Sequence, residues 1–195
     1  VITLPTRSPD VSWLSPFPGG SPLLPKAATF LPGGCYVSVA KASDGALQVD
    51  FESKLATTQD RIGLDGDPQH AGFQFRASNE VASATAKQTY YVRPKDGKDG
   101  EGKTKNWPGN KDMKDLAWKG QSVVVGGKRY FTVYLDHPSN PKPSFYSERD
   151  YGRFGSYFKT EVTPSKPLSV KYRLVIKQGE RSADECASLS KEFLN

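Results

Sequence analysis

The sequence has no long apolar run and is poor in cysteine and histidine. No stretch approaches the roughly 20 consecutive apolar residues that a transmembrane helix needs, so no membrane span is expected. The two cysteines and two histidines form neither a CxxC motif nor a Cys/His cluster, so a structural zinc site is not expected. No signal peptide is visible, and the chain begins at Val1, so we expect a processed chain, an excerpt or part of something longer.

The composition is typical of strands and turns. Glycine (18) and proline (15) together make up about one residue in six of the 195, and aromatic residues reach 11%. This favours a β-rich globular fold over a helical bundle or a disordered chain. The net charge is +6, but no nucleic-acid-binding motif accompanies it, so a nucleic-acid partner is not expected.

Proline and glycine are concentrated at the start of the chain. Residues 1–34 contain seven prolines and two Gly-Gly pairs, which predicts an extended, irregular segment before a single domain at 35–195. Cys35 and Cys186 lie at opposite ends of that domain. A disulfide between them would suit an exported protein, but the sequence does not decide whether they pair.

Seven segments have the pattern of strands. In residues 47–55, Leu47, Val49 and Phe51 alternate with polar residues, as a half-buried strand requires. A Gly-Gly pair at 126–127 between two β-rich runs predicts a hairpin. Strands are expected at residues 35–40, 47–55, 72–77, 88–93, 122–125, 128–135 and 168–176.

Only the end of the chain has a helical pattern. Ser182 followed by Glu185 resembles a capping box, and Cys186, Leu189 and Phe193 are spaced as one face of a helix over 182–194. No alternation of strands and helices suggests a parallel sheet. The sequence therefore predicts an all-β fold, an antiparallel β-sandwich with one C-terminal helix.

One charged stretch is open to two interpretations. Residues 95–105 interleave lysines and acids with glycine, which favours a solvated loop. The alternative is a basic arm for nucleic acid or an acidic polysaccharide.

The residues most suited to chemistry lie in predicted loops. His70 and His137 both have carboxylates nearby, and loops on a β-scaffold are where sites usually form. The densest polar stretch is 136–155, where prolines are expected to hold the chain in an extended path. Candidate acid–base residues are His137, His70 and Asp136, and candidate binding residues are Arg76, Arg149, Asp150, Tyr146 and Asn140. The alternative is a rigid structural crossover.

Three classes of chemistry can be compared with these residues. A serine-hydrolase triad lacks the G-x-S-x-G signature. Metal ligation by His70, His137 and nearby aspartates has no diagnostic spacing, so no metal is assigned and the cofactor is left unknown. Acid–base work on a sugar, with arginine neutralising a carboxylate, matches the residue types present.

Three segments carry a family resemblance. Residues 135–141 (LDHPSNP), 149–154 (RDYGRF) and 171–179 (KYRLVIKQG) resemble the PmoA-like family of uncharacterised bacterial proteins, with weaker similarity over 45–195. The resemblance implies a β-sandwich of the galactose-mutarotase-like kind, secreted or periplasmic, near carbohydrate-utilisation functions. The longer N-terminal half that is usual in the family is not evident in residues 1–44, so whether such a half is missing is left open.

Two functions follow as expectations. The first is a carbohydrate-active or carbohydrate-binding β-sandwich, with a carbohydrate as its partner and catalysis undecided. The second is a non-catalytic structural or interaction module of a larger envelope assembly. Convergence of the candidate residues in one open concavity would favour the first, and scattering or burial in internal contacts would favour the second.

Overall fold

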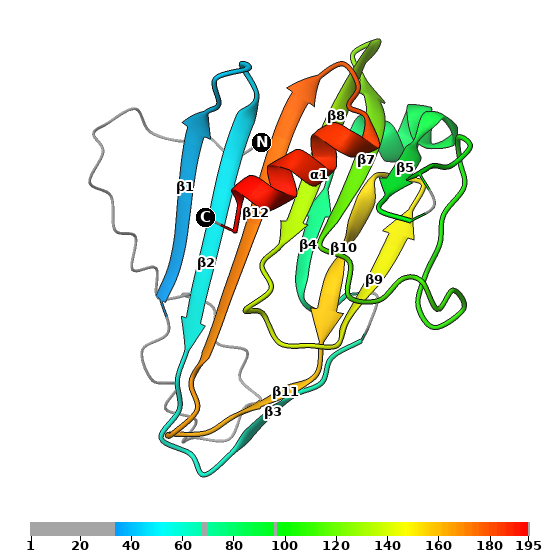
Figure 1. The fold of residues 1–195 in the computed structure, drawn as a ribbon. Helices are drawn as coiled ribbons and strands as arrows, with labels where there is room; N and C mark the ends of the chain where they lie inside the picture. The colour runs from blue at the N-terminus through cyan, green and yellow to red at the C-terminus, as the bar shows by residue number, and fades with distance from the viewer. Residues whose placement is uncertain (1–33, 68–69, 96, 195) are drawn as a thin grey trace.

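The computed structural model describes residues 34–67, 70–95 and 97–194. Its elements are mainly antiparallel strands, with one α-helix at the C-terminal end (Figure 1). This confirms the expected all-β sandwich with a terminal helix. Of the predicted N-terminal segment 1–34, only Gly34 is described, and it begins the first strand.

The largest sheet has seven strands, and its order mixes segments far apart in sequence. The order is β1 (Gly34–Lys41), β2 (Leu47–Leu55), β12 (Leu168–Gln178), β8 (Lys128–Asp136), β7 (Trp118–Val125), β5 (Tyr90–Arg93) and β6 (Gly97–Lys98). Every neighbouring pair is antiparallel.

The remaining elements flank this sheet. A three-stranded sheet has the order β4 (Phe73–Arg76), β10 (Arg153–Phe158) and β9 (Ser144–Arg149), and a small pair joins β11 (Thr160–Val162) to β3 (Ile62–Leu64). The helical elements are a π-helical segment η1 (Val81–Thr85), a 3₁₀ turn η2 (Ala86–Gln88) and α1 (Ala183–Glu192).

The alternation of side chains along the strands produces two cores, one on each face of the seven-stranded sheet. On β8, Phe131, Val133 and Leu135 belong to the core under α1, which also contains Cys186. Tyr134 points to the opposite face and belongs to the core shared with the three-stranded sheet. The molecule therefore has three layers, with α1 crossing one face of the large sheet and the small sheet on the other (Figure 1).

The start of α1 agrees with a detailed expectation, and the structure decides a question about the cysteines that the sequence left open. The Ser182 hydroxyl accepts from the Glu185 backbone N–H at 3.2 Å, and the Glu185 carboxylate accepts from the Ser182 backbone N–H at 2.7 Å, so the capping box is present. Both cysteines are free: Cys35 is exposed on β1, and Cys186 is the buried residue of α1, in the core between that helix and the large sheet.

Two predictions about loops were incomplete. The stretch 136–155 contains β9 and begins β10, so it forms a hairpin rather than an extended crossover. Within the charged stretch 95–105, Gly97–Lys98 forms β6, and the Asp99 carboxylate accepts from the buried Arg93 side chain at 2.7 Å. Part of that stretch is thus anchored to the body of the protein.

Candidate functional site

The eight residues predicted for a site fall in three places. Four lie at the end of β8, just after it and on β9, three lie at the end of β4 and around the nearby turn between β9 and β10, and one lies in the loop before β4. They are, in that order, Asp136, His137, Asn140 and Tyr146; Arg76, Arg149 and Asp150; and His70.

Asp136 is the centre of the first group, and it is buried. Its carboxylate accepts hydrogen bonds from four side chains: Tyr146 at 2.6 Å, Asn140 at 2.7 Å, and Lys142 and Ser144 at 3.0 Å. Tyr146 is fully enclosed, and burial next to Asp136 holds the pKa of its hydroxyl well above the ordinary value. Three of the predicted residues, Asp136, Asn140 and Tyr146, therefore lie together, but in an internal hydrogen-bond network that also includes Lys142 and Ser144.

This network holds strand β12 in place. The Asn140 side-chain carbonyl accepts from the Lys171 backbone N–H, and its amide donates to the Lys171 carbonyl, both at 2.7 Å. The His137 ring lies edge-on to Phe193, with ring centroids 5.3 Å apart, and contacts the Ser139 hydroxyl at 2.7 Å. Burial lowers the pKa of His137, and the charge of Lys171 lowers it further, which favours the neutral imidazole.

The second group surrounds the turn between β9 and β10, and its charges are engaged within the protein. Arg149 donates to the Asn106 side chain at 2.7 Å and to the Glu148 carbonyl at 2.6 Å. The Arg76 guanidinium lies over the Tyr151 ring at 5.4 Å, and Asp150 accepts from Lys87 at 3.1 Å. These contacts are those of a structural surface cluster.

His70 stands apart from the other predicted residues. It lies in the loop before the three-stranded sheet, whereas His137 follows β8 of the large sheet. Its exposed ring contacts the Asp67 carboxylate at 2.7 Å, an i,i+3 pair within the same loop.

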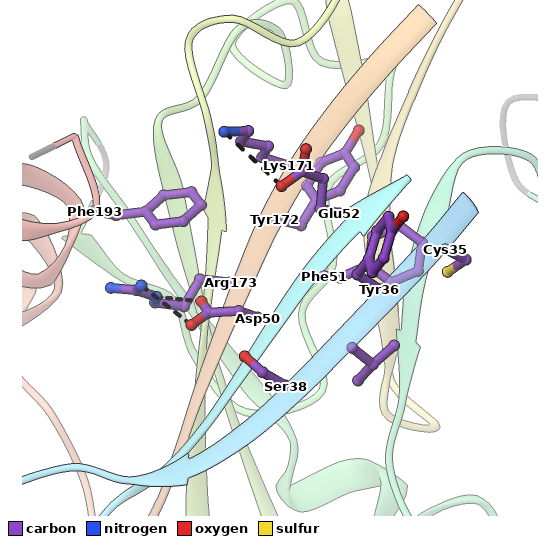
Figure 2. Close-up of a pocket in the computed structure, with 11 residues that line it drawn as sticks. Cys35, Tyr36, Ser38, Asp50, Phe51, Glu52, Lys171, Tyr172, Arg173 and Phe193 are labelled. Atoms are coloured by element: carbon purple, nitrogen blue, oxygen red, sulfur yellow. Dashed lines mark hydrogen bonds and ion pairs between the residues drawn. The ribbon is translucent and has the colours of Figure 1, made fainter. Parts of the chain in front are cut away.

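A groove that sequence reasoning missed lies beside the C-terminal end of α1. It has a volume of about 550 Å³ and crosses β1, β2 and β12, with Phe193 at one side and Tyr36 at the other (Figure 2). We call it the Tyr36–Phe193 groove. Its lining residues are Cys35, Tyr36, Val37, Ser38, Asp50, Phe51, Glu52, Lys171, Tyr172, Arg173 and Phe193, which include none of the eight predicted residues.

Two cross-strand ion pairs form the polar floor of this groove. The Arg173 guanidinium donates to both oxygens of Asp50 and lies 4.8 Å from the Phe193 ring centroid. Lys171 is 3.9 Å from the Glu52 carboxylate. Register explains both pairs, because Asp50 lies opposite Arg173 and Glu52 opposite Lys171 in the β2–β12 ladder. Charges of both signs therefore alternate along an open surface (Figure 2).

Tyr36 supplies an aromatic platform at the rim. It faces Glu52 across the β1–β2 ladder, and it is 58% exposed. A tyrosine this exposed in the middle of a strand buries little apolar area in the described structure, so its position is not explained by packing.

The described residues contain a second hollow, of about 460 Å³, near the β11 end of the molecule. Its cations include Lys142, which donates to Asp136 at 3.0 Å, and Lys159, which contacts Asp65 at 2.8 Å. Because no aromatic residue lines this hollow, whereas Tyr36 and Phe193 line the Tyr36–Phe193 groove, that groove is the stronger candidate for a ligand.

One signal for the groove is present in the sequence. The polar face of the β2 alternation carries Asp50 and Glu52, and β12 carries Lys171 and Arg173 with the same period of two. Their pairing follows only from the strand order, which places β12 next to β2 across more than 100 residues of sequence.

Comparison with known proteins identifies the family but no characterised relative. Among the described residues, no group of three His, Cys, Asp or Glu is placed to bind a metal ion, and no helix has the length and apolarity to cross a membrane. No curated protein and no solved structure matches the chain significantly. A family of unknown function, DUF6807, matches residues 11–191, a span that includes much of the proline-rich segment. The chain therefore belongs to the family DUF6807.

Proposed function

We propose that this protein is a carbohydrate-binding β-sandwich and that the Tyr36–Phe193 groove takes a segment of a glycan. The observation that carries the proposal is the exposed Tyr36 ring beside a floor of paired polar side chains. The volume of the groove, about 550 Å³, is in the range of small-ligand sites.

The chemistry of a sugar matches both parts of this surface. A pyranose ring has a face of C–H groups, which packs on the electron-rich face of an aromatic ring, and a perimeter of hydroxyls that both donate and accept. Asp50 and Glu52 provide acceptors, and Lys171 and Arg173 provide donors. Each charge has an opposite charge beside it, so the floor offers hydrogen bonds without a large net charge, as a neutral glycan requires.

The eight predicted residues are scattered or engaged in internal contacts, which counts against a carbohydrate site built from them and favours the interaction module described below. The site proposed here is a different surface, the groove, and some of the predicted residues take supporting roles behind it. Asn140, anchored on Asp136 together with Tyr146, fixes the backbone of Lys171, and His137 packs on Phe193. Each of these contacts holds a residue that lines the groove, Lys171 in the first case and Phe193 in the second. Arg76, Arg149, Asp150 and His70 lie outside the groove and are given no role in ligand binding.

The sequence resemblance adds a setting for this activity. The resemblance of three segments to PmoA-like proteins implies a galactose-mutarotase-like sandwich, a finer assignment that the family match to DUF6807 does not make, and it favours a secreted or periplasmic protein that meets glycans outside the cytoplasm. A secreted or periplasmic location is therefore part of the proposal. We assign binding rather than a reaction, because the two carboxylates of the groove, Asp50 and Glu52, are each paired with a cation.

The test is a thermal-shift and calorimetric screen with neutral and uronic-acid-containing oligosaccharides. A ligand that binds only the folded state raises the melting temperature, and we expect this with neutral oligosaccharides. Tyr36→Ala and Arg173→Gln should each weaken binding by about tenfold or more, equivalent to about 1.4 kcal/mol. Tyr130→Ala, at a half-buried tyrosine of β8 that does not line the groove, is the matched control and should bind normally. Absence of any shift across the panel would refute the proposal.

A second function, an interaction module, is favoured by a separate observation. The edge strand β1 exposes Val37 and Val39 to solvent in the described structure, with exposures of 60% and 48%. Apolar side chains in this position are typical of a surface that meets another protein.

A further inference from the structure

Strand β1 forms one edge of the seven-stranded sheet, and its outer edge has no partner among the described residues. It is eight residues long and pairs with β2 along its whole length, from Gly34 opposite Lys54 to Lys41 opposite Leu47. The opposite edge of the same sheet is β6, which has only two residues, one of them Lys98. The two edges therefore differ greatly in their capacity to accept a further strand.

The usual protections of an edge strand are missing from β1. Natural edges are protected by charges, proline, bulges or short length. The β1 sequence, GCYVSVAK, has no proline, its ladder to β2 is continuous, and its single charge is at the last position, Lys41. Tyr36, Val37 and Val39 are all about half exposed or more. This strand is therefore suited to β-strand addition.

We propose that β1 pairs antiparallel with β1 of a second copy of this chain, so that two seven-stranded sheets join into one. The strand is self-complementary about Ser38. A two-fold axis at that residue places Val37 opposite the partner's Val39, and Tyr36 opposite the partner's Ala40. The same register keeps the two Lys41 side chains at opposite ends of the pair, so that like charges are well separated.

This pairing has a consequence for the groove, which rests on the proposed function. A two-fold axis perpendicular to the sheet leaves both Tyr36–Phe193 grooves on the same face of the joined sheet. With about 3.3 Å per residue and 4.8 Å between strands, the two Tyr36 positions are about 14 Å apart. The partner strand also extends the floor of each groove beyond β1. A glycan chain that reaches both grooves would therefore gain avidity.

The test is the mass of the full chain in solution, measured by sedimentation velocity. Over about 1 to 200 µM, mass action predicts a shift from 21.4 kDa to twice that value. Val39→Lys should stay monomeric, because it places a lysine opposite the partner's Val37. Leu194→Lys, at an equally exposed apolar residue outside β1, is the matched control and should dimerise normally. Circular dichroism confirms that each variant is folded.

A charge-pair experiment tests the register itself. Val37→Glu alone should also be monomeric, whereas an equimolar mixture of Val39→Lys and Val37→Glu chains should dimerise, because the two new charges then lie opposite each other. Wild-type protein that stays monomeric up to the highest concentration, or a Val39→Lys chain that dimerises like wild type, would overturn the proposal. Failure of glycan binding with dimerisation intact would overturn only the proposed function, and a monomer that binds glycans would overturn only the dimer.

Discussion

Lys119 and Glu148 form an ion pair 3.0 Å long between the two sheets, and both side chains are completely buried. The rings of Tyr91, Tyr146 and Phe154 surround the lysine ammonium at 5.4–5.5 Å. The carboxylate has further partners, because it also accepts from the Arg93 guanidinium and the Lys105 backbone N–H. Glu148 is thus shared by several donors, whereas Lys119 depends on Glu148 as its only carboxylate in the described structure.

Because Glu148 has several partners and Lys119 has one carboxylate, replacing each of them should change the stability by very different amounts. Glu148→Gln removes the charge that balances two buried cations, and we expect a loss of about 3–5 kcal/mol in the free energy of unfolding. Lys119→Met leaves Glu148 paired with Arg93 and fills the aromatic cage with an apolar chain of similar size, so stability should change by less than about 1 kcal/mol or increase. Urea denaturation of both variants measures the difference. Equal losses would show that the lysine charge is essential to the core.

The same lysine predicts a rise in stability at alkaline pH. Burial lowers the pKa of Lys119 from 10.5 to about 8, although Glu148 opposes the shift. Between about pH 8 and 10.5 the unfolded chain therefore binds more protons at this residue than the folded chain, and linkage requires its contribution to the free energy of unfolding to increase with pH. The expected gain is roughly 2–3 kcal/mol.

The comparison of variants isolates this contribution from other titrating groups. The stability of wild type relative to Lys119→Met should rise steadily from pH 8 to pH 10.5, as followed by urea denaturation at each pH. Lys128→Met, at an exposed position of β8, is the control for replacing a lysine by methionine. If the difference in unfolding free energy between wild type and Lys119→Met does not change from pH 8 to pH 10.5, Lys119 has the same pKa in the folded and unfolded chain and the prediction is wrong.

Local patterns in the sequence predicted the elements that depend on local physics. The alternation of Leu47, Val49 and Phe51 marked β2, and the Ser182–Glu185 spacing marked the start of α1. Strand β7 was expected only from residue 122, but it begins at Trp118. The missed part includes Lys119 and Gln121, both fully buried on the face toward the small sheet, and buried polar residues there hide the apolar alternation.

The site depended on long-range pairing, which sequence patterns do not encode. The polar side chains at and after the end of β8 were candidates for a site, with a rigid structural role as the alternative, and whether they act on a ligand stays a prediction. Asp136, Asn140 and Tyr146 do converge, yet they satisfy one another in the interior. The groove arises because Asp50 meets Arg173 from a strand 123 residues away. Only the strand order brings those charges together.

The link between the buried network and the groove gives a last prediction, centred on Asn140. Its side chain makes the only described hydrogen bond to the Lys171 backbone N–H from outside the β12 ladders, and it also bonds the Lys171 carbonyl and the Asp136 carboxylate. Asn140→Ala removes the described side-chain partner of the Lys171 backbone N–H, whereas the Lys171 carbonyl and the Asp136 carboxylate keep other donors, so we expect a loss of about 1–3 kcal/mol in stability. The Lys171 amide should also exchange hydrogen faster than in wild type, because the segment opens locally. Ser139→Ala, next in sequence but exposed, is the control and should leave that amide protected. Unchanged exchange at Lys171 in Asn140→Ala would show that the ladders to β2 and β8 fix this strand without Asn140 and that Asn140 does not position the groove.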